Sequence, residues 1–345
     1  MITELTLKNF KSFVERTIAF SPLTVLTGMN GSGKSSVIQA IRMVQKSCGD
    51  GYGDPRMDDH VLPNKLKSKL TKENRYSLIL KKDSKNYSTE VNGIESESYG
   101  FVPDDGKRES DLACISYLSA DRFGPQNHLP AGNMNEIIGV GNYGEYVIAF
   151  LDKFQYSKVP ERLRLNQEDE NLFDNTNAWL SVISKGTVLR YDKNQSQNVF
   201  YPFYDGIVPT ETGYGISFTL PVIVSLLYAG EKNPERIIMI ENPESHLHPA
   251  AQTEIGKLIA LAAANGKQVI IETHSDHIMD GIRIVAKQEK IDAHDVKFHF
   301  FRRDSFEEET RVETPELYQD GKLSFWPEGF FDQGLKDKAF LARKM

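Results

Sequence analysis

A glycine-rich octapeptide near the N-terminus constrains the fold of this chain more than any other stretch of its sequence. Residues 28–35 read GMNGSGKS, which matches the pattern G-x-x-x-x-G-K-[ST] at every fixed position. Residues 23–27 form an apolar, β-rich segment before it, and residues 36–44 place apolar side chains at helical spacing after it. A glycine-rich turn with a chance lysine is the alternative, but the flanking strand and helix favour a phosphate-binding loop.

The residue types of this loop suit the triphosphate of a nucleotide. Glycines let the backbone curl around an anion, so that successive N–H groups and a helix N-terminus point at the β-phosphate. Lys34 adds a positive charge for the β- and γ-phosphates, and the Ser35 hydroxyl is placed to bind Mg²⁺. The sequence therefore predicts ATP and Mg²⁺ as cofactors, and the loop residues expected to bind them are Asn30, Gly31, Ser32, Gly33, Lys34, Ser35 and Ser36.

The composition is that of an ordinary soluble globular protein and narrows the classes of function. The chain has 345 residues, 39% of them hydrophobic and 26% charged, enough for one large α/β domain or two smaller ones. Its net charge of −7 opposes a strong general affinity for nucleic acid, so the charge does not imply DNA as a partner. The two cysteines, Cys48 and Cys114, match no metal-binding spacing. Neither a run of about 18 apolar residues nor a signal pattern occurs, which predicts a cytoplasmic protein without a membrane partner.

Two further apolar segments end in polar residues that suit nucleotide chemistry. Residues 236–240 have the pattern of a buried strand that ends at Glu241, a carboxylate placed to bind Mg²⁺. After an expected helix at residues 251–264, residues 267–271 have the pattern of a second buried strand, which leads to His274. The default interpretation of a lone histidine is a hydrogen-bonded residue at the end of a strand.

Several motifs resemble those of SMC/RecF-type ATPases, relatives of the ABC cassettes. Residues 8–13, KNFKSF, resemble the NF(K/R)SF opening of this family. Residues 240–249, IENPESHLHP, and residues 272–275, ETHS, resemble its prokaryotic ENPExHLHP … ETHS group of AAA-family ATPases. The resemblance implies an α/β, ABC-type or RecF-like P-loop ATPase head with a mainly parallel core sheet flanked by helices, an antiparallel β lobe and a helical insertion. The chain lacks the heptads of an SMC coiled coil and has no room for a Toprim nuclease.

The resemblance also implies roles for individual residues of a nucleotide site. Lys11 would lie near the nucleotide, although a plain surface lysine is an equal alternative. His274 would be the switch histidine that senses the γ-phosphate. Gln126, with Arg122 as its neighbour, would sense Mg²⁺ and the γ-phosphate from the loop after a strand at residues 113–118, although exposed polar loop residues are the commoner case.

A glycine turn before an apolar helix resembles the G-x-G-x-S form of the ABC signature. Gly213, Gly215 and Ser217 precede an apolar run at residues 220–227, so we expect a helix N-terminus with free N–H donors there. In the family this motif binds the γ-phosphate held by the other subunit, which implies a homodimer formed through ATP. A plain helix start is the alternative.

The sequence departs from the ABC pattern at the residue that follows the Mg²⁺ carboxylate. ABC cassettes place a catalytic glutamate there, whereas this chain has Asn242, which can orient a water molecule but cannot accept its proton. Glu244 is the nearest carboxylate that could act as the base; otherwise hydrolysis would be slow or triggered by a partner. The predicted catalytic residues are therefore Glu244, His274 and Asn242.

The pair His246 and His248 allows two interpretations. An H-x-H pair at the end of a strand can bind a metal ion, but no cluster of cysteine or aspartate nearby supplies further ligands. The family resemblance instead implies a segment like the D-loop of ABC ATPases, which contacts the other subunit.

We expect a single ATPase head that spans residues 1–345. Residues 324–333, SFWPEGFFDQ, resemble the W-P-x-G-F-F tail of an uncharacterised bacterial branch of these ATPases and suit a packed cap or a docking surface. The expected segments are N-terminal strands with the phosphate-binding loop (1–44), a β lobe with loops (45–120), a helical insertion (140–205), a core with the signature, the Mg²⁺ carboxylate and the switch histidine (206–296), and a C-terminal cap (297–345).

Three functions are compatible with these features. The first is an ATPase that dimerises on ATP and regulates a separately encoded effector, a nuclease or toxin, with anti-phage defence as its setting. The second is a DNA-binding repair or recombination ATPase of the RecF kind, which the acidic net charge disfavours. The third is a transporter cassette, which needs a membrane partner and a stricter L-S-G-G-Q signature.

Overall fold

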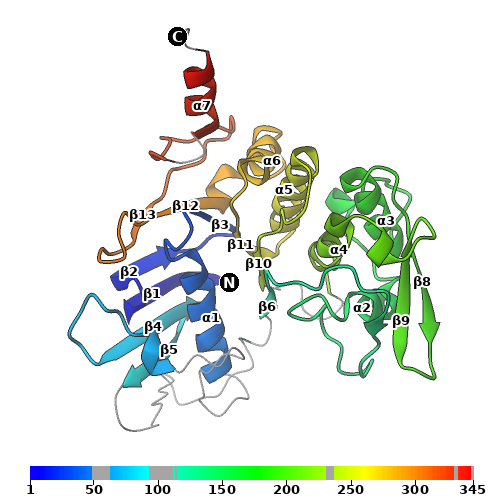
Figure 1. The fold of residues 1–345 in the computed structure, drawn as a ribbon, viewed down its shortest axis with the longest axis horizontal. Helices are drawn as coiled ribbons and strands as arrows, with labels where there is room; N and C mark the ends of the chain where they lie inside the picture. Colours follow the sequence, from blue (N-terminus) through cyan, green and yellow to red (C-terminus); the bar gives the residue numbers. More distant parts are fainter. Residues whose placement is uncertain (49–62, 93–111, 113–114, 231–236, 330–332, 343–345) are drawn as a thin grey trace. The chain divides into compact units, whose positions relative to one another are not determined.

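The computed structural model describes residues 1–48, 63–92, 112, 115–230, 237–329 and 333–342 (Figure 1). The chain divides into two compact units. We call Ala113–Asp292, together with Met1, the middle unit, and Ile2–Leu112 with Ala293–Met345 the terminal unit. The segment boundaries expected from the sequence follow a different division and stay a prediction. Cys114 and the tail residues Phe330 and Phe331 lie outside the described residues.

An antiparallel sheet of the terminal unit is built from β1 (Ile2–Phe10), β2 (Phe13–Ala19), β4 (Arg75–Lys82) and β5 (Lys85–Asn92), in the order β2-β1-β4-β5. Apolar and polar residues alternate along β1, so that Leu5 and Leu7 are buried while their neighbours are more exposed. Leu5 lies opposite Ile18 of β2 and Leu80 of β4, which gives the sheet one apolar face. This sheet is the antiparallel lobe, and the N-terminal strands belong to it.

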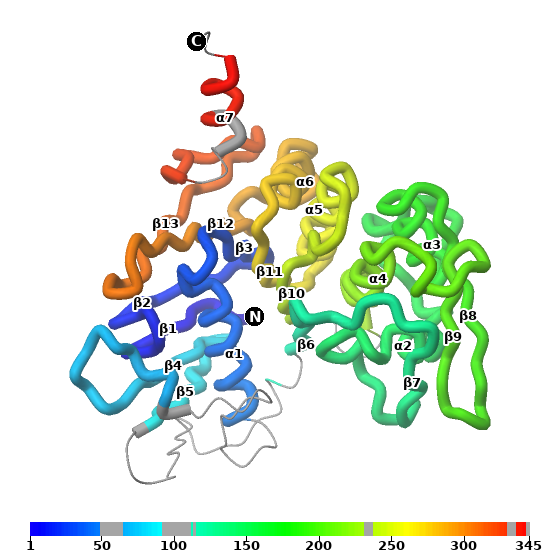
Figure 2. Tube along the Cα trace, in the orientation of Figure 1, coloured from blue at the N-terminus to red at the C-terminus, as the bar shows by residue number. Residues whose placement is uncertain are grey.

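Parallel strand pairing joins the two ends of the chain within the terminal unit. β3 (Leu23–Gly28) pairs in parallel with β12 (Val296–Arg302), and β13 (Arg311–Glu313) pairs antiparallel to β12. In Figure 2 the blue tube of β3 lies beside the orange tube of β12. The first five residues of β3 are buried, as is typical of a parallel strand that is covered on both faces. The strand therefore ends at a fixed point, and α1 (Lys34–Cys48) begins after the intervening loop.

Three strands of the middle unit are parallel and adjacent. β10 (Ile237–Glu241) pairs with β6 (Ile115–Leu118) on one side and with β11 (Gln268–Glu272) on the other. The register places Glu241 beside Glu272. Because the carboxyl ends of parallel strands meet at one edge of a sheet, the loops that follow these strands lie together.

Helices α5 (Pro249–Ala264) and α6 (Asp276–Lys287) follow β10 and β11 and pack against each other through glycine. A Cβ atom on Gly281 of α6 would lie 2.3 Å from the Thr253 carbonyl oxygen of α5. A side chain is therefore excluded at this position, and the two backbones touch. The helix expected between the two apolar strands is confirmed.

The rest of the middle unit combines helices with a small antiparallel sheet. α2 (Val147–Phe154) and α3 (Leu172–Ile183) lie in the expected helical insertion, which also contains a β-hairpin. α4 (Tyr214–Leu227) is the apolar helix expected after the glycine turn. The strands of the small sheet are β7 (Leu129–Pro130), β8 (Leu189–Asn194) and β9 (Val199–Tyr204), and single-turn helices in the chain lie at Pro63–Leu66, Glu161–Leu163, Pro209–Glu211 and Ala293–Asp295.

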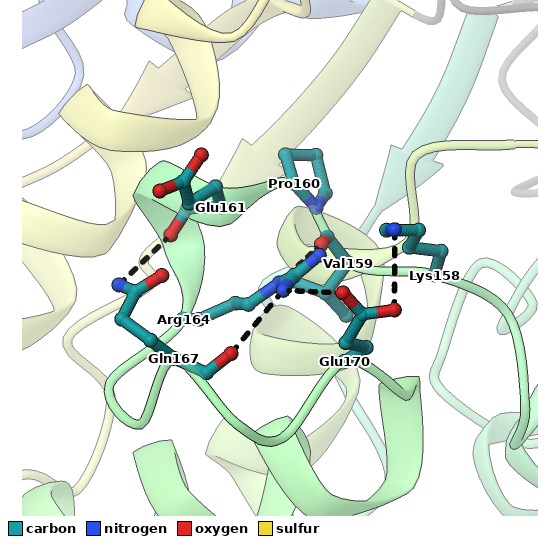
Figure 3. A pocket seen from close by; sticks show the side chains of 7 residues that line it. All are labelled: Lys158, Val159, Pro160, Glu161, Arg164, Gln167 and Glu170. Carbon is teal, nitrogen blue, oxygen red and sulfur yellow. Dashed lines mark hydrogen bonds and ion pairs between the residues drawn. The ribbon is translucent and has the colours of Figure 1, made fainter.

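A surface pocket of about 640 Å³ lies beside the turn at Glu161–Leu163 (Figure 3). Arg164 donates a hydrogen bond of 3.1 Å to one carboxylate oxygen of Glu170, and the Lys158 ammonium lies 3.1 Å from the other. Arg164 also donates to the Val159 carbonyl oxygen at 2.8 Å. Both cations are therefore paired with the Glu170 carboxylate within the pocket.

The last described element is α7 (Gln333–Leu341). Within the described ranges, no helix has both the length and the apolar character that crossing a bilayer requires. The predicted α/β class is confirmed, with mostly parallel core strands, an antiparallel lobe and flanking helices.

Candidate functional site

The phosphate-binding loop connects β3 to α1 in the terminal unit, and its glycines have backbone conformations that other residues avoid. Gly28 and Gly33 have φ angles of 134° and 103°. A Cβ atom on Gly28 would lie 2.1 Å from the Phe301 carbonyl oxygen of β12. A side chain at this position would push β12 away from β3, so glycine is required where the loop leaves the strand.

Lys34 is the first residue of α1, and its side chain folds back over the loop. It is only 3% exposed, and its ammonium donates hydrogen bonds to the carbonyl oxygens of Gly28 (3.1 Å) and Met29 (2.7 Å). A positive charge is therefore held at the loop, beside the N-terminus of α1, and this arrangement fits a phosphate chain. Of the other loop residues, Asn30, Gly31 and Ser35 are exposed, whereas Ser32 and Ser36 are buried.

Lys11 lies in the turn between β1 and β2 of the same unit. Its backbone is left-handed, with a φ of 50°, and its N–H donates to the Leu66 carbonyl oxygen at 2.8 Å. Burial lowers the pKa of Lys11, and no charged group among the described residues offsets this loss of solvation. A bound anion beside Lys11 would stabilise its charged form, which is consistent with the predicted place of Lys11 near a nucleotide.

In the middle unit, two carboxylates lie at adjacent strand ends. Glu241 is the half-buried last residue of β10, and its carboxylate accepts a hydrogen bond from the Ala120 N–H at 3.4 Å. Glu272 ends β11 beside it and is buried. Carboxylate oxygens are the ligands that Mg²⁺ prefers, so Glu241 fits its predicted role. The ETHS motif contains Glu272, but nothing in the sequence marks it as a neighbour of Glu241.

Asn242 follows Glu241 with a left-handed backbone. Its φ of 46° is a conformation that asparagine adopts more readily than glutamate. Its N–H donates to the Glu272 carbonyl oxygen at 2.8 Å. Its amide oxygen is buried and accepts no hydrogen bond within the described part of the chain. The backbone geometry therefore gives a physical reason for asparagine here, and one amide oxygen remains for a water molecule or a substrate.

A hydrogen bond joins Glu244 to the turn after β11. The His274 N–H donates to Glu244 Oε1 at 2.6 Å. Burial raises the pKa of Glu244, while the His274 N–H and the positive charge of Arg122 oppose that shift. The side chain of His274 is exposed. The structure thus brings two predicted catalytic residues together, and the carboxylate holds the backbone of the histidine.

Arg122 joins the strand ends to α4. It is 3% exposed, and burial lowers its pKa to about 10, while the charges of Glu244 and Glu241 oppose the shift. Nothing in the sequence marks Arg122 except its place near Gln126, because its partners are main-chain groups. Four carbonyl oxygens accept hydrogen bonds from its guanidinium, those of Ser119 (2.8 Å), Glu241 (2.6 Å), Asn242 (2.7 Å) and Phe218 (3.1 Å).

The predicted signature residues lie at the start of α4. Gly213 is the exposed N-cap residue of the helix. A Cβ atom on Gly215 would lie 2.6 Å from the His246 carbonyl oxygen, so the first turn packs against the segment after β10. The Ser217 hydroxyl is buried and faces Tyr204, whose pKa burial raises to about 12. Ser217 is therefore turned inward, away from the exposed end of the helix.

The remaining predicted site residues lie on exposed loops of the middle unit. Gln126 is exposed in the loop after β6. His246 and His248 are also exposed, and His248 Nδ1 accepts a hydrogen bond from the Ala250 N–H at 3.3 Å as the cap of α5. In the part of the chain that the structure describes, no third histidine, cysteine, aspartate or glutamate joins them in a metal-binding group.

The candidate residues thus form two groups, each within one unit. The terminal unit holds the phosphate-binding loop and Lys11, and the middle unit holds the carboxylates, His274, Arg122 and the start of α4. The assignment of individual roles to these residues stays a prediction.

A family model described as "AAA domain, putative AbiEii toxin, Type IV TA system" matches residues 23–280, most of the chain. The chain belongs to this AAA family. A second model, described as a protein of unknown function (DUF3696), matches residues 291–341. None of the curated proteins matches the chain.

Solved structures with a similar fold include SMC head domains. One, an SMC head bound to the C-winged-helix domain of ScpA, has a TM-score of 0.61 and 17% identity over 92% of this chain and 98% of that chain. Another, an Smc head domain with an extended coiled coil bound to the C-terminal domain of ScpA derived from Pyrococcus furiosus, has a TM-score of 0.56 and 13% identity over 99% of each chain. This AAA family member therefore has the fold of an SMC/ABC-like P-loop ATPase head.

Glu244→Gln should change how the stability of this AAA protein depends on pH. Burial raises the pKa of Glu244 in the folded state, so the unfolded chain loses this proton first as the pH rises above about 4.3. Above that pH the ionisable group costs folding stability, and glutamine does not. The thermal unfolding midpoint of the variant, relative to the wild type, should therefore increase as the pH rises above about 4.3. If the unfolding midpoints of the variant and the wild type change with pH in the same way, the pKa of Glu244 is not raised in the folded state.

Proposed function

We propose that this AAA family member binds and hydrolyses ATP, and that ATP joins two copies into a dimer that regulates a separate effector. The observation that carries the proposal is the Lys34 ammonium, held over a glycine loop at the N-terminus of α1. A loop of this form offers a positive charge and backbone N–H donors together, and triphosphate binding needs both.

The loop residues and Lys11 would hold the nucleotide, while Ser35 and Glu241 would bind Mg²⁺, with Gln126 as a further ligand. The exposed Ser35 hydroxyl and the half-buried Glu241 carboxylate supply oxygen atoms of the type that Mg²⁺ prefers. When bound, Mg²⁺ would neutralise charge on the phosphates.

Two of the predicted residues suit different roles in hydrolysis. Glu244 could accept the proton of the attacking water, because its raised pKa moves the carboxylate toward the range of an effective base. Asn242 could instead orient the water through its buried amide oxygen, and hydrolysis would then be slow. We favour Glu244 as the base. Since Glu244 also binds the His274 backbone, it would connect proton transfer to the γ-phosphate sensor.

The N-terminus of α4 would complete the site of a second copy. Gly213 exposes this helix end, and Gly215 lets it rest on the segment that carries His246. Ser217 would have to rotate away from Tyr204 to reach a phosphate. The DNA clamp of the RecF kind has no support beyond the fold, and the net charge of −7 opposes it.

A separately encoded effector, a nuclease or toxin, is our proposal for what the dimer regulates. The family description names a toxin and a toxin–antitoxin system, which supports a role in anti-phage defence. We place this role in the cytoplasm.

Lys34→Ala should weaken ATP binding by at least about tenfold, because backbone N–H groups do not replace the lost charge at the phosphates. Lys46→Ala, in the last turn of the same helix, is the matched control and should bind as the wild type does. Equilibrium titration with a fluorescent ATP analogue and Mg²⁺ measures both variants. Near wild-type affinity in Lys34→Ala would show that the loop is not the nucleotide site.

ATP with Mg²⁺ should shift the protein from monomer toward dimer, because the α4 N-terminus of one copy would complete the site of the other. Light scattering with a slowly hydrolysed ATP analogue measures the change in molar mass. Lys34→Ala should show no shift under the same conditions. If the wild-type protein binds the analogue and its molar mass does not change, Gly213 and Gly215 do not complete the nucleotide site of a second copy.

Glu244→Gln should lower ATP turnover by about 10²–10⁴ and leave ATP binding intact, if Glu244 is the general base. Asn242→Asp tests the alternative, since aspartate tolerates the left-handed backbone and supplies the missing carboxylate. It should raise turnover if the wild type lacks a base. Glu241→Gln is the control and should lose Mg²⁺-dependent binding as well. If ATP turnover is unchanged in both Glu244→Gln and Asn242→Asp, His274 is the next candidate for the general base.

A further inference from the structure

The C-terminal segment of unassigned function, residues 291–341, reaches the phosphate-binding loop at its start and at its tip. Phe301 of β12 pairs with Gly28, where the loop begins. The ring of Phe306, a residue 83% exposed, lies 3.9 Å from the position that a Cβ atom on Gly31 would take. Both contacts lie within the terminal unit.

Thr310 makes a third contact, inside the loop. It is 0% exposed, and its hydroxyl lies 2.8 Å from the Ser32 carbonyl oxygen and 2.7 Å from the Ser12 hydroxyl. The Thr310 hydroxyl is the donor toward both oxygen atoms, so its single proton is shared between the Ser32 carbonyl oxygen and the Ser12 hydroxyl oxygen. The Thr310 N–H donates to the Ser12 carbonyl oxygen at 3.0 Å, so these two residues are joined twice.

These contacts fix the direction of the peptide group between Ser32 and Gly33. In a trans peptide the C=O and N–H bonds point to opposite sides of the chain, so a carbonyl held by Thr310 turns the Gly33 N–H the other way. A Cβ atom on Gly33 would lie 2.9 Å from the Ser12 hydroxyl and 3.1 Å from that of Thr310. The hydroxyl pair therefore packs directly against the loop backbone and leaves the peptide little room to rotate.

We propose that Thr310 is a positioning residue of the phosphate-binding loop, and that the C-terminal segment is thereby part of the nucleotide site. The inference rests on the proposed binding of ATP by this loop. Thr310 holds the Ser32 carbonyl on one side and so keeps the Gly33 N–H directed at phosphate on the other. Through Ser12 it also holds the turn that carries Lys11. The ligand class is a polyphosphate, because the backbone N–H donors of a glycine-rich loop suit phosphate oxygens rather than a base or ribose.

Thr310→Val tests the proposal, because valine keeps the shape of threonine but leaves the buried Ser32 carbonyl without its donor. It should weaken the binding of ATP and of inorganic tripolyphosphate by the same factor, about tenfold. Thr310→Ser keeps the hydroxyl and should restore binding of both ligands to near the wild-type level.

Thr176→Val is the matched control for the loss of a buried hydroxyl. Thr176 is also 0% exposed, and its hydroxyl donates to the Leu172 carbonyl oxygen at 2.7 Å within α3. This variant should lower the thermal unfolding midpoint, measured without ligand, and keep wild-type affinity for ATP and tripolyphosphate. A loss of affinity specific to Thr310→Val would therefore reflect the loop and not general destabilisation.

Calorimetric titration with each ligand separates the outcomes. Wild-type affinity in Thr310→Val, or a loss confined to ATP, would overturn the inference even where Lys34→Ala still identifies the loop as the ATP site. A wild-type protein that binds neither ligand would instead reject the proposed function, and the inference with it. If Thr310→Val does not fold, Ser12→Ala decides: it removes the side-chain hydroxyl that the Thr310 hydroxyl contacts and should weaken the binding of both ligands severalfold, whereas unchanged binding would overturn the inference.

Discussion

The parallel pairing of β3 with β12 is the interaction on which the phosphate-binding loop depends. A loop rich in glycine has few side chains to pack, and glycine loses more conformational freedom on folding than any other residue. The conformation of the loop must therefore be imposed by its neighbours. β12 fixes the point where the loop leaves β3, with the Phe301 carbonyl lying where a side chain of Gly28 would be. Thr310 and Ser12 then hold the far side. An N–H array that is set before the ligand arrives loses less entropy on binding than one that must first be ordered.

In the middle unit, the buried side chain of Arg122 holds the backbone near the carboxylates in place, as β12 and Thr310 do for the phosphate-binding loop. Burying a guanidinium is costly unless its donors are satisfied, and Arg122 satisfies them with main-chain carbonyl oxygens at the ends of β6 and β10 and in α4. Its charge also stabilises the carboxylates of Glu241 and Glu244. A shift of α4 would therefore have to break or carry along the hydrogen bonds at the end of β10. This arrangement gives a physical connection between the helix expected to meet a second copy and the carboxylates expected to act on the nucleotide.

Local sequence patterns predicted the helices, strands and motifs. They could not predict Arg122 and Thr310, the residues whose side chains hold the backbone of these motifs in place. The loop before α1, the apolar β10 and β11, and the helix after the glycine turn all have their signal within about ten residues of sequence. Arg122 and Thr310 act on carbonyl oxygens that are 119 and 278 residues away, and a main-chain acceptor has no residue type that a motif could contain. The departure at Asn242 was visible in the sequence, but its reason, a left-handed φ at the end of β10, belongs to the backbone. Similarly, the inward orientation of Ser217 depends on Tyr204, a residue of a separate strand.

The distance in sequence between Ser32 and Thr310 has a consequence for the synthesis of the protein. The two residues are 278 positions apart, and a ribosome adds about 5–20 residues per second. The phosphate-binding loop is therefore synthesised tens of seconds before Thr310, the residue that holds its backbone. During that interval β3 also lacks β12, its parallel neighbour. A nascent chain thus carries the complete nucleotide motif without the contacts that shape it. Competence for ATP would begin only when the C-terminal segment has left the ribosome and docked.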